Sequence, residues 1–333
     1  MLKLRTALFI LFSLIGIMYL IPFIFNSSEK KPYYSVIQTT EEANSPERTP
    51  ALPQPTVPPS KVTLLFGGDL MFDRHIRLAL EKNGVDFALR ELRPLLLQHD
   101  FVIANLEGPV TSFSSKSVGS VVGSTNNYLF TFDPSIAEML HKMNITIVNI
   151  GNNHILNFGV AGLSQTKVQL DESKVRYFGN ASSDESERIV FVEKNGVKIA
   201  FTNYNAFGTD GFQRALADIQ KARATADIVV MYTHWGAEYQ PQANSVIQNQ
   251  AHQFIDAGAD AIIGSHPHVV QQHELYKDKH IYYSLGNFVF DQYFEEAVQN
   301  GLLISLAIEN KKILNVNEIP ITLQKNGQTI LKN

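Results

Sequence analysis

The sequence contains no cysteine and a single tryptophan among its 333 residues. Without cysteine there is no disulfide, thiolate nucleophile or cysteine-type zinc site, so any metal ion must be held by His, Asp, Glu or Asn. A concentrated basic segment is also missing, because the net charge is −4 and the basic residues are spread along the chain. We therefore expect no nucleic-acid partner. Hydrophobic residues make up 44% of the chain, which is typical of a protein with a full core.

The first 25 residues are predicted to form a membrane anchor. Residues 6–25 are an apolar run without a charged side chain, and about 20 such residues can cross a bilayer. No small-residue cleavage pattern follows, which favours a retained anchor over a removed signal peptide. Lys3 and Arg5 favour an internal N-terminus, although Lys30 and Lys31 beyond the run weaken this bias. We expect a single-pass protein of the cell membrane with an extracytoplasmic C-terminal domain.

Residues 26–60 are polar and rich in proline, and they are predicted to form a disordered stalk. Proline prevents helix and central strand and favours extended chain. The prolines concerned are Pro46, Pro50, Pro53, Pro55, Pro58 and Pro59. We expect residues 61–333 to form one domain, because α/β folds of about 250 residues can be single units.

Within the predicted domain, apolar runs with the length of strands alternate with helical patterns. This alternation predicts a layered α/β fold, either α/β or α/β/β/α, and a final run of strands indicates a second sheet. Asn195-Gly196 is expected to form a hairpin turn. We also expect a tight turn at Gly67-Gly68 and a helix over residues 87–97 that Pro94 kinks or ends early.

Five apolar runs in this domain each end at polar side chains of types that bind metal ions. Because the carboxyl ends of parallel strands are where open α/β sheets bind their ligands, we expect these side chains to converge. They are Asp69; Asn105 and Glu107; Asn153 and His154; His234; and His266 and His268. Asparagine, carboxylate and imidazole together suit Mn²⁺, Zn²⁺ or Fe²⁺ better than Ca²⁺ or Mg²⁺. We therefore predict a centre for one or two divalent ions, with the alternative that Asp69 only caps the following helix.

Pro267 separates His266 from His268 and is expected to stiffen the loop that carries them. Proline fixes its own φ and pushes the preceding residue towards an extended conformation. Imidazoles on a stiff loop need little ordering when an ion arrives. Taken alone, this stretch fits two surface histidines beside a turn equally well. The metal interpretation therefore depends on the other strand ends.

Six short stretches carry a family resemblance. They are Gly67-Gly68-Asp69-Leu70-Met71-Phe72, Asn105-Leu106-Glu107-Gly108-Pro109, Gly151-Asn152-Asn153-His154, His234-Trp235-Gly236-Ala237-Glu238, Gly264-Ser265-His266-Pro267-His268 and Ser284-Leu285-Gly286-Asn287-Phe288. Their order resembles that of the calcineurin-type metallophosphoesterases and, more closely, that of the CapA family of capsule and poly-γ-glutamate synthesis proteins. The resemblance spans about residues 62–301, and it implies a four-layer α/β/β/α sandwich.

The resemblance also implies roles for individual residues. Metal ligands are implied at Asp69, Asn153, His234, His266 and His268. Glu107 would act as the bridging carboxylate and catalytic group, and His154 as a proton donor to the leaving group or substrate. Residues expected to contact the substrate or support the ligands are Arg74, Asn105, Asn152, Trp235, Glu238 and Asn287. An ordinary surface role for Arg74, a core role for Trp235 and a turn role for Asn287 are the alternatives.

Two positions depart from the metallophosphoesterase pattern. Met71 stands where the first motif usually has histidine, and Asn105-Leu106-Glu107 replaces the usual Gly-Asp. One metal position is therefore short of a ligand or is filled differently, with His75 and Glu238 as candidate donors. Both a single ion and a site that binds without hydrolysing are compatible with these changes.

The resemblance leads to an expected function. We expect a membrane-anchored CapA-like protein of capsule, poly-γ-glutamate, biosynthesis or export with a phosphoesterase-like metal site. Its expected partners are the lipid bilayer, other capsule-synthesis membrane subunits, and an anionic polymer or phosphoester substrate. The alternative is an active metal-dependent phosphoesterase that acts on an extracytoplasmic substrate unrelated to capsule.

Overall fold

The computed structural model of the chain describes residues 61–180, 184–208 and 211–332. The predicted anchor, residues 1–25, and the predicted stalk, residues 26–60, lie outside the described residues. Within the described ranges, no helix combines the length and the apolar character that crossing a membrane requires.

The first sheet joins parallel strands from the first half of the domain to antiparallel strands from its end. Its order is β14-β13-β12-β1-β2-β3-β4, and β11 also pairs with β1. Strands β1 to β4 and β11 run parallel, whereas β12 to β14 are antiparallel additions. The strands are β1 Lys61–Leu70, β2 Phe101–Leu106, β3 Ile145–Asn149, β4 Arg176–Phe178, β11 Asn287–Val289, β12 Asn300–Glu309, β13 Lys312–Leu323 and β14 Thr329–Leu331.

The second sheet has the order β5-β6-β7-β8-β10-β9, with a parallel centre and an antiparallel strand at each edge. The strands are β5 Val190–Lys194, β6 Val197–Asn205, β7 Ile228–His234, β8 Ala261–Ser265, β9 His273–Tyr276 and β10 Lys279–Tyr282. The predicted hairpin turn between β5 and β6 is confirmed, because Asn195 and Gly196 both have positive φ, at 51° and 73°.

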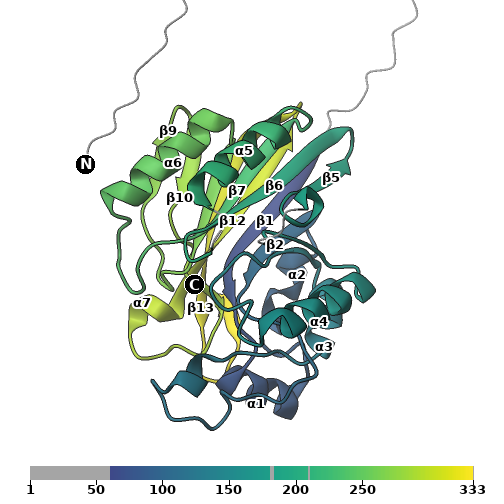
Figure 1. Cartoon of the computed structure of the whole chain (residues 1–333), viewed down its shortest axis with the longest axis vertical. Coiled ribbons are helices and arrows are strands. Elements are labelled where there is room, and N and C mark those ends of the chain that lie inside the picture. The colour runs from purple at the N-terminus through teal and green to yellow at the C-terminus, as the bar shows by residue number, and fades with distance from the viewer. Residues whose placement is uncertain (1–60, 181–183, 209–210, 333) are drawn as a thin grey trace, which may run out of the picture. The chain divides into compact units, whose positions relative to one another are not determined.

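Helices cover the outer face of each sheet, with α5 and α6 on one side of the strands and α2, α3 and α4 on the other (Figure 1). The helices are α1 Arg74–Asn83, α2 Arg93–Leu96, α3 Ser135–Lys142, α4 Gly159–Glu172, α5 Gly211–Arg223, α6 Ser245–Ala257 and α7 Glu296–Gln299, with short 3₁₀ turns η1 Arg90–Leu92, η2 Thr125–Tyr128 and η3 Glu185–Glu187.

Apolar side chains fill three layers. Phe66 and Ile103 of the first sheet pack against Phe201 and Tyr232 of the second. A second cluster lies between the first sheet and helices α1, α3 and α4, and a third lies between the second sheet and helices α5 and α6. The predicted mixed α/β fold with two sheets is thus confirmed.

Gly67 and Gly68 do not form the predicted tight turn. Strand β1 continues through both glycines to Leu70, and β11 lies alongside this part of it. A methyl group on Gly68 would lie 1.8 Å from the carbonyl oxygen of Gly286. The two glycines are therefore required for the close approach of a neighbouring strand, which local sequence does not reveal.

The predicted helix over residues 87–97 is also wrong. The structure has only the short elements η1 and α2 there, and Pro94 lies in the first turn of α2. Proline is tolerated at the start of a helix, where its missing N–H is not needed, but not in the interior. Pro94 therefore starts a new helix rather than kinking a longer one.

Candidate metal centre

The predicted convergence of the strand ends takes place, and it involves both sheets. In the first sheet, the register places Asn287, Asp69 and Asn105 side by side on β11, β1 and β2. In the second sheet, it places His234 of β7 beside Ser265 of β8. The two rows meet, because the backbone N–H of His266 donates to Oδ2 of Asp69 at 3.1 Å.

Asp69, Glu107 and His268 form a fully buried group whose possible ligand atoms all lie within 4.8 Å of one another. Nε2 of His268 lies 3.7 Å from Oε1 of Glu107, and its Nδ1 lies 3.5 Å from Oδ2 of Asp69. Among the described residues no N–H or hydroxyl group donates to either carboxylate oxygen of Glu107, whose hydrogen-bonding neighbour is the carboxyl group of Asp69. A buried carboxylate without such donors is costly, so Glu107 needs a proton or a cation.

Burial controls the protonation of this group. It raises the pKa of Asp69 to about 6, although the N–H of Asn105 that donates to Asp69 opposes the rise. Burial, followed by the neighbouring charge of Asp69, raises the pKa of Glu107 well above its usual value. Burial also lowers the pKa of His268 to about 3. The imidazole is therefore neutral at neutral pH and has a lone pair available for a cation.

Asn287 fixes the orientation of His268. The amide nitrogen of Asn287 donates to the carbonyl oxygen of Val298 at 3.0 Å and to Oε1 of Gln292 at 3.1 Å, so its Oδ1 is left as an acceptor. Nδ1 of His268 lies 2.9 Å from this oxygen and therefore carries the proton. The lone pair of His268 is then on Nε2, which faces Glu107.

Asn153, His234 and His266 form a second group beside the first. Nε2 of His234 lies 2.9 Å from Oδ1 of Asn153, and the rings of His234 and His266 are 4.8 Å apart. Nδ1 of His266 is buried without a hydrogen-bond partner among the described residues. Burial lowers the pKa of His266 to about 4 and that of His234 well below its usual value. Both imidazoles are therefore neutral at neutral pH.

The loop between the two site histidines differs from the prediction. His266 has φ 95° and His268 has φ 58°, so His266 is not extended although Pro267 follows it. Positive φ is strained for residues other than glycine, and it persists where the surroundings hold it. Here the N–H of His266 is held by Asp69, which turns the loop into the site.

His154 reaches the edge of the first group. Its Nε2 lies 3.8 Å from Oε1 of Glu107, and its Nδ1 lies 3.1 Å from Oδ1 of Asn157. Because Oδ1 of Asn157 also accepts from the backbone N–H of Phe130, it is an acceptor for Nδ1 as well. Burial lowers the pKa of His154 to about 4, so its Nε2 is an unprotonated acceptor at neutral pH.

A chain of buried asparagine amides holds the carboxylate of Asp69 in place. Asn105 donates to Asp69 at 2.8 Å and accepts from Asn149 and Asn152 at 2.9 and 3.1 Å. Asn203, from the second sheet, donates to Asn149 at 2.9 Å. Sequence reasoning missed Asn149 and Asn203, although a polar residue at the end of an apolar strand was a signal that would have found both.

Several predicted residues lie outside the centre. Trp235 does not line the site but is buried in the core beneath α6, where its indole N–H donates to the carbonyl oxygen of Tyr283 at 2.9 Å. The side chain of His75 is directed at the carbonyl oxygen of Lys325, 3.1 Å away, and does not supply the missing donor. Met71 is fully buried and its sulfur accepts from the backbone N–H of Asp73.

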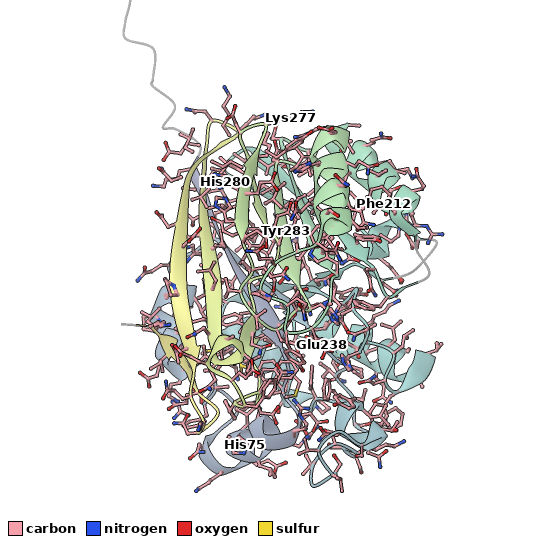
Figure 2. All side chains as sticks on the ribbon, turned by 90° about the vertical axis from the view of Figure 1, so that its left-hand side faces the viewer. His75, Phe212, Glu238, Lys277, His280 and Tyr283 are labelled. Carbon is pink, nitrogen blue, oxygen red and sulfur yellow. The ribbon has the colours of Figure 1, made fainter. Side chains whose placement is uncertain are left out.

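Glu238 is exposed and belongs to the loop after β7. In Figure 2 the labelled residues run from Lys277 and His280 at one end, through Tyr283, to Glu238 and His75 at the other. The charge of Glu238 contributes to the raised pKa of Asp69 and of Glu107, so it lies near the first group without joining it.

Other neighbours of the site were not predicted. The ring of Phe207 lies 4.2 Å from that of His266. Ser265 lies 3.0 Å from Nδ1 of His234, and its hydroxyl donates to the carbonyl oxygen of Thr233. Ser265 directly precedes His266, which was an available signal. The position of Phe207 depends on the packing of a loop and had no signal in the sequence.

Comparison with known proteins identifies the family to which this chain belongs. The model of the bacterial capsule synthesis protein family PGA_cap matches residues 63–292. The chain belongs to this family. Capsule biosynthesis protein CapA of Bacillus anthracis is 29% identical over 284 residues, which are 80% of this chain and 68% of that protein. PGA biosynthesis protein CapA of Bacillus subtilis (strain 168) is 33% identical over 244 residues, which are 68% of this chain and 63% of that protein. The predicted CapA family membership is thereby confirmed.

Solved structures give a weaker likeness. A phosphatase from Mycoplasma pneumoniae superimposes on this PGA_cap protein with a TM-score of 0.49 and 17% identity, over 79% of this chain and 94% of that chain. A sulfate thiohydrolase SoxB of Thermus thermophilus gives a TM-score of 0.46 with 11% identity. Scores at this level add nothing to the assignment that the family match makes.

Proposed function

We propose that this protein takes part in the synthesis or export of capsule polymer, poly-γ-glutamate, and that its domain holds a divalent cation at the strand ends. Two relatives named for capsule or PGA biosynthesis support the first part. The observation that carries the second part is Glu107, which is fully buried beside Asp69 and His268 with no N–H or hydroxyl donor to either oxygen among the described residues. A cation supplies the charge that this carboxylate lacks.

The residues present fit such a cation. Asp69, Glu107 and His268 would hold one ion, and Asn153, His234 and His266 offer donors for a second. Carboxylate, amide and imidazole together suit Mn²⁺, Zn²⁺ or Fe²⁺. Since Met71 replaces a histidine, the first group has only three side-chain donors. A bound ion would act as a Lewis acid towards a phosphoryl or carboxylate oxygen of the substrate.

Membrane attachment is part of the proposal. Residues 1–25 would anchor the chain, and residues 26–60 would hold the domain outside the membrane near other capsule-synthesis subunits. The apolar run of residues 6–25 and the prolines after it support this arrangement. Protease added to intact protoplasts is expected to digest the domain, whereas complete protection would reverse the topology.

Capsule yield tests the proposal in a strain that lacks its own copy of the gene. The strain is complemented with the natural chain, with Glu107→Gln or with Glu138→Gln, an exposed glutamate of α3 that pairs with Lys142. We expect Glu107→Gln to reduce polymer at least tenfold at equal protein level, and Glu138→Gln to restore it. Full capsule from Glu107→Gln would contradict the proposal.

Phosphoester hydrolysis is a second candidate, and the position of His154 favours it. In such a reaction the oxygen of water bonds to phosphorus, the ester P–O bond breaks, and the leaving alcohol oxygen takes up a proton. Nε2 of His154 is an acceptor beside Glu107, so it can take the proton of the attacking water, while the leaving oxygen on the opposite side of phosphorus takes its proton from solvent. Asn152 and Asn157 hold His154 in position for this transfer.

Turnover of an aryl phosphate by the purified full-length chain, supplied with Mn²⁺, tests this candidate. Removal of a general acid–base group typically lowers the rate by about 10²–10⁴-fold, so His154→Ala should do so while His141→Ala does not. A natural chain that binds metal and supports capsule synthesis but hydrolyses no phosphoester would contradict the phosphoesterase candidate. The candidate role in capsule synthesis would then remain.

A further inference from the structure

A groove of about 320 Å³ lies beside the metal centre. Its walls come from the start of α1, from η2 and the loop before it, from the loop after β7 and from the segment after β11. Its lining residues include Arg74, Asn127, Tyr239, Asp291 and Phe294. Its volume is at the lower end of that of small-molecule sites, so it fits one or two small units of a ligand rather than a protein element.

Aromatic rings connect the groove to the metal centre. The guanidinium of Arg74 lies 5.0 Å from the ring centre of Phe130 and 5.4 Å from that of Phe290. The ring of Phe130 lies 4.4 Å from that of His154, and the ring of Phe290 lies 4.8 Å from that of His268. One layer of aromatic rings thus separates Arg74 from the two site histidines.

Arg74 keeps hydrogen-bond donors for a ligand. Nη2 is paired with Asp291, whose other oxygen accepts from the backbone N–H of His75. Nη1 makes only two contacts with Asn127, both 3.5 Å long, and Nε is buried with no partner among the described residues. A guanidinium has five N–H groups, and a buried donor without an acceptor is costly. A ligand oxygen in the groove would satisfy Nη1, whereas Nε is closed off from solvent.

The backbone of Arg74 has a strained conformation. Its φ is 50°, which is strained for a residue other than glycine, at the start of α1. Such strain persists where the surroundings over-determine it, and it is common at ligand-binding positions. Asp291 and the two aromatic rings supply that constraint here.

We propose that the groove binds a second anionic group of the substrate, at a fixed spacing from the group at the metal centre, and that Arg74 recognises it. The inference rests on the proposed function, because it assumes that an anionic group occupies the centre. One anion cannot contact both places, since the rings of Phe130 and Phe290 lie between them. The substrate class is therefore a chain with repeated anionic groups, which under the proposed function are the carboxylates of poly-γ-glutamate, rather than a single small phosphoester.

The other walls of the groove suit such a chain. Tyr239 lies between the two places, because its ring is 6.1 Å from that of His268 and it also lines the groove. Its hydroxyl accepts from Gln292, and Phe294 packs edge-on against its ring at 5.2 Å. Apolar stems of the chain would pack on these rings while its carboxylates meet Arg74 and the centre.

Binding of defined oligomers to the full-length chain tests the inference. The probes are γ-linked glutamate oligomers of one to five residues, and inorganic phosphate as a single anion. The variants are Arg74→Gln, Arg74→Lys and, as a control, Arg90→Gln, whose arginine pairs with Asp86 on the surface. Affinity is measured by calorimetry, and metal content and the melting midpoint are measured on the same samples.

We expect the natural chain and Arg90→Gln to bind the pentamer at least tenfold more tightly than the single glutamate. Arg74→Gln should lose this tenfold gain but keep its metal and its affinity for phosphate, and Arg74→Lys should keep part of the gain. Equal pentamer affinity for Arg74→Gln and the natural chain would overturn the inference, and so would affinity that does not grow with length. The natural chain could instead retain no metal and still lose its pentamer affinity in Arg74→Gln. That result would contradict the proposed metal centre and leave the role of Arg74 in the groove.

Discussion

Glu107 and its neighbours show how single residues define the site. A carboxylate placed 3.7 Å from His268 and 3.8 Å from His154, without a hydrogen-bond donor among the described residues, is not stabilised by the protein alone. Burial lowers the pKa values of both histidines, so neither is a cationic partner at neutral pH. The charge that balances Glu107 must therefore come from a proton or from a bound ion.

Asn287 is predicted to control metal affinity without touching the metal. Replacing it with alanine removes the acceptor for Nδ1 of His268, so the ring is free to change its tautomer and to rotate. Changes of this kind typically weaken binding about 10–100-fold. Competition with a fluorescent chelator measures the effect, with Asn326→Ala as a surface control. An unchanged affinity for Asn287→Ala would contradict the role assigned to Asn287.

Residue types at strand ends were sufficient to predict much of the site. Asp69, Glu107 and His268 meet in one group, and Asn153, His234 and His266 meet beside it. Residue type could not distinguish Trp235, which directly follows the end of β7 at His234 but packs into the core. It also could not place His75, whose distance from the site depends on the packing of α1, or Glu238, whose distance depends on the loop after β7.

At the scale of elements, the contact of β1 with β11 builds the site. This contact brings Asn287 beside Asp69, and it is made possible by glycines that let the two backbones approach. From the sequence, Gly67-Gly68 indicated a turn. The pairing with β11 could not be predicted, because that strand lies more than two hundred residues later in the chain. Pairings of this kind lie beyond local patterns, whereas the hairpin at Asn195-Gly196 is local and was predicted correctly.

Gly68→Ala is therefore predicted to separate β1 from β11. Its methyl group would collide with the carbonyl of Gly286, so we expect the free energy of unfolding to fall by about 3 kcal/mol. Gly119→Ala is the control, because open space surrounds Gly119 and only its positive φ opposes the change, at about 1 kcal/mol. Denaturant unfolding of metal-free samples measures both. Equal losses in the two variants would contradict this account of β1.

At the scale of the whole folded unit, a bound cation would join the two sheets. Asp69 lies in the first sheet and Glu107 directly after its strand β2, whereas His234, His266 and His268 come from the second sheet or the loop after it. Apart from the apolar layer between the sheets, their contact at this end consists of polar groups such as the bond from His266 to Asp69. An ion held from both sides would resist their separation.

Removal of metal is predicted to lower stability. At an ion concentration 100-fold above the dissociation constant, binding adds about 2.7 kcal/mol to the free energy of unfolding. For a domain of this size that corresponds to a fall in the melting midpoint of roughly 5–10 °C on addition of EDTA. Glu107→Gln should melt at the same temperature with and without EDTA. An EDTA effect of equal size in the variant would show that the ion acts elsewhere.

The most direct measurement is the metal content of the purified full-length chain after exposure to Mn²⁺ or Zn²⁺ and removal of the excess. The natural chain and the control His280→Ala, whose imidazole lies on β10 away from the strand ends, are predicted to retain about one ion or more per chain. Glu107→Gln and His268→Ala are predicted to retain about one ion per chain less than the control. A natural chain that retains no ion, or variants that retain as much as the control, would contradict a cation at Asp69, Glu107 and His268.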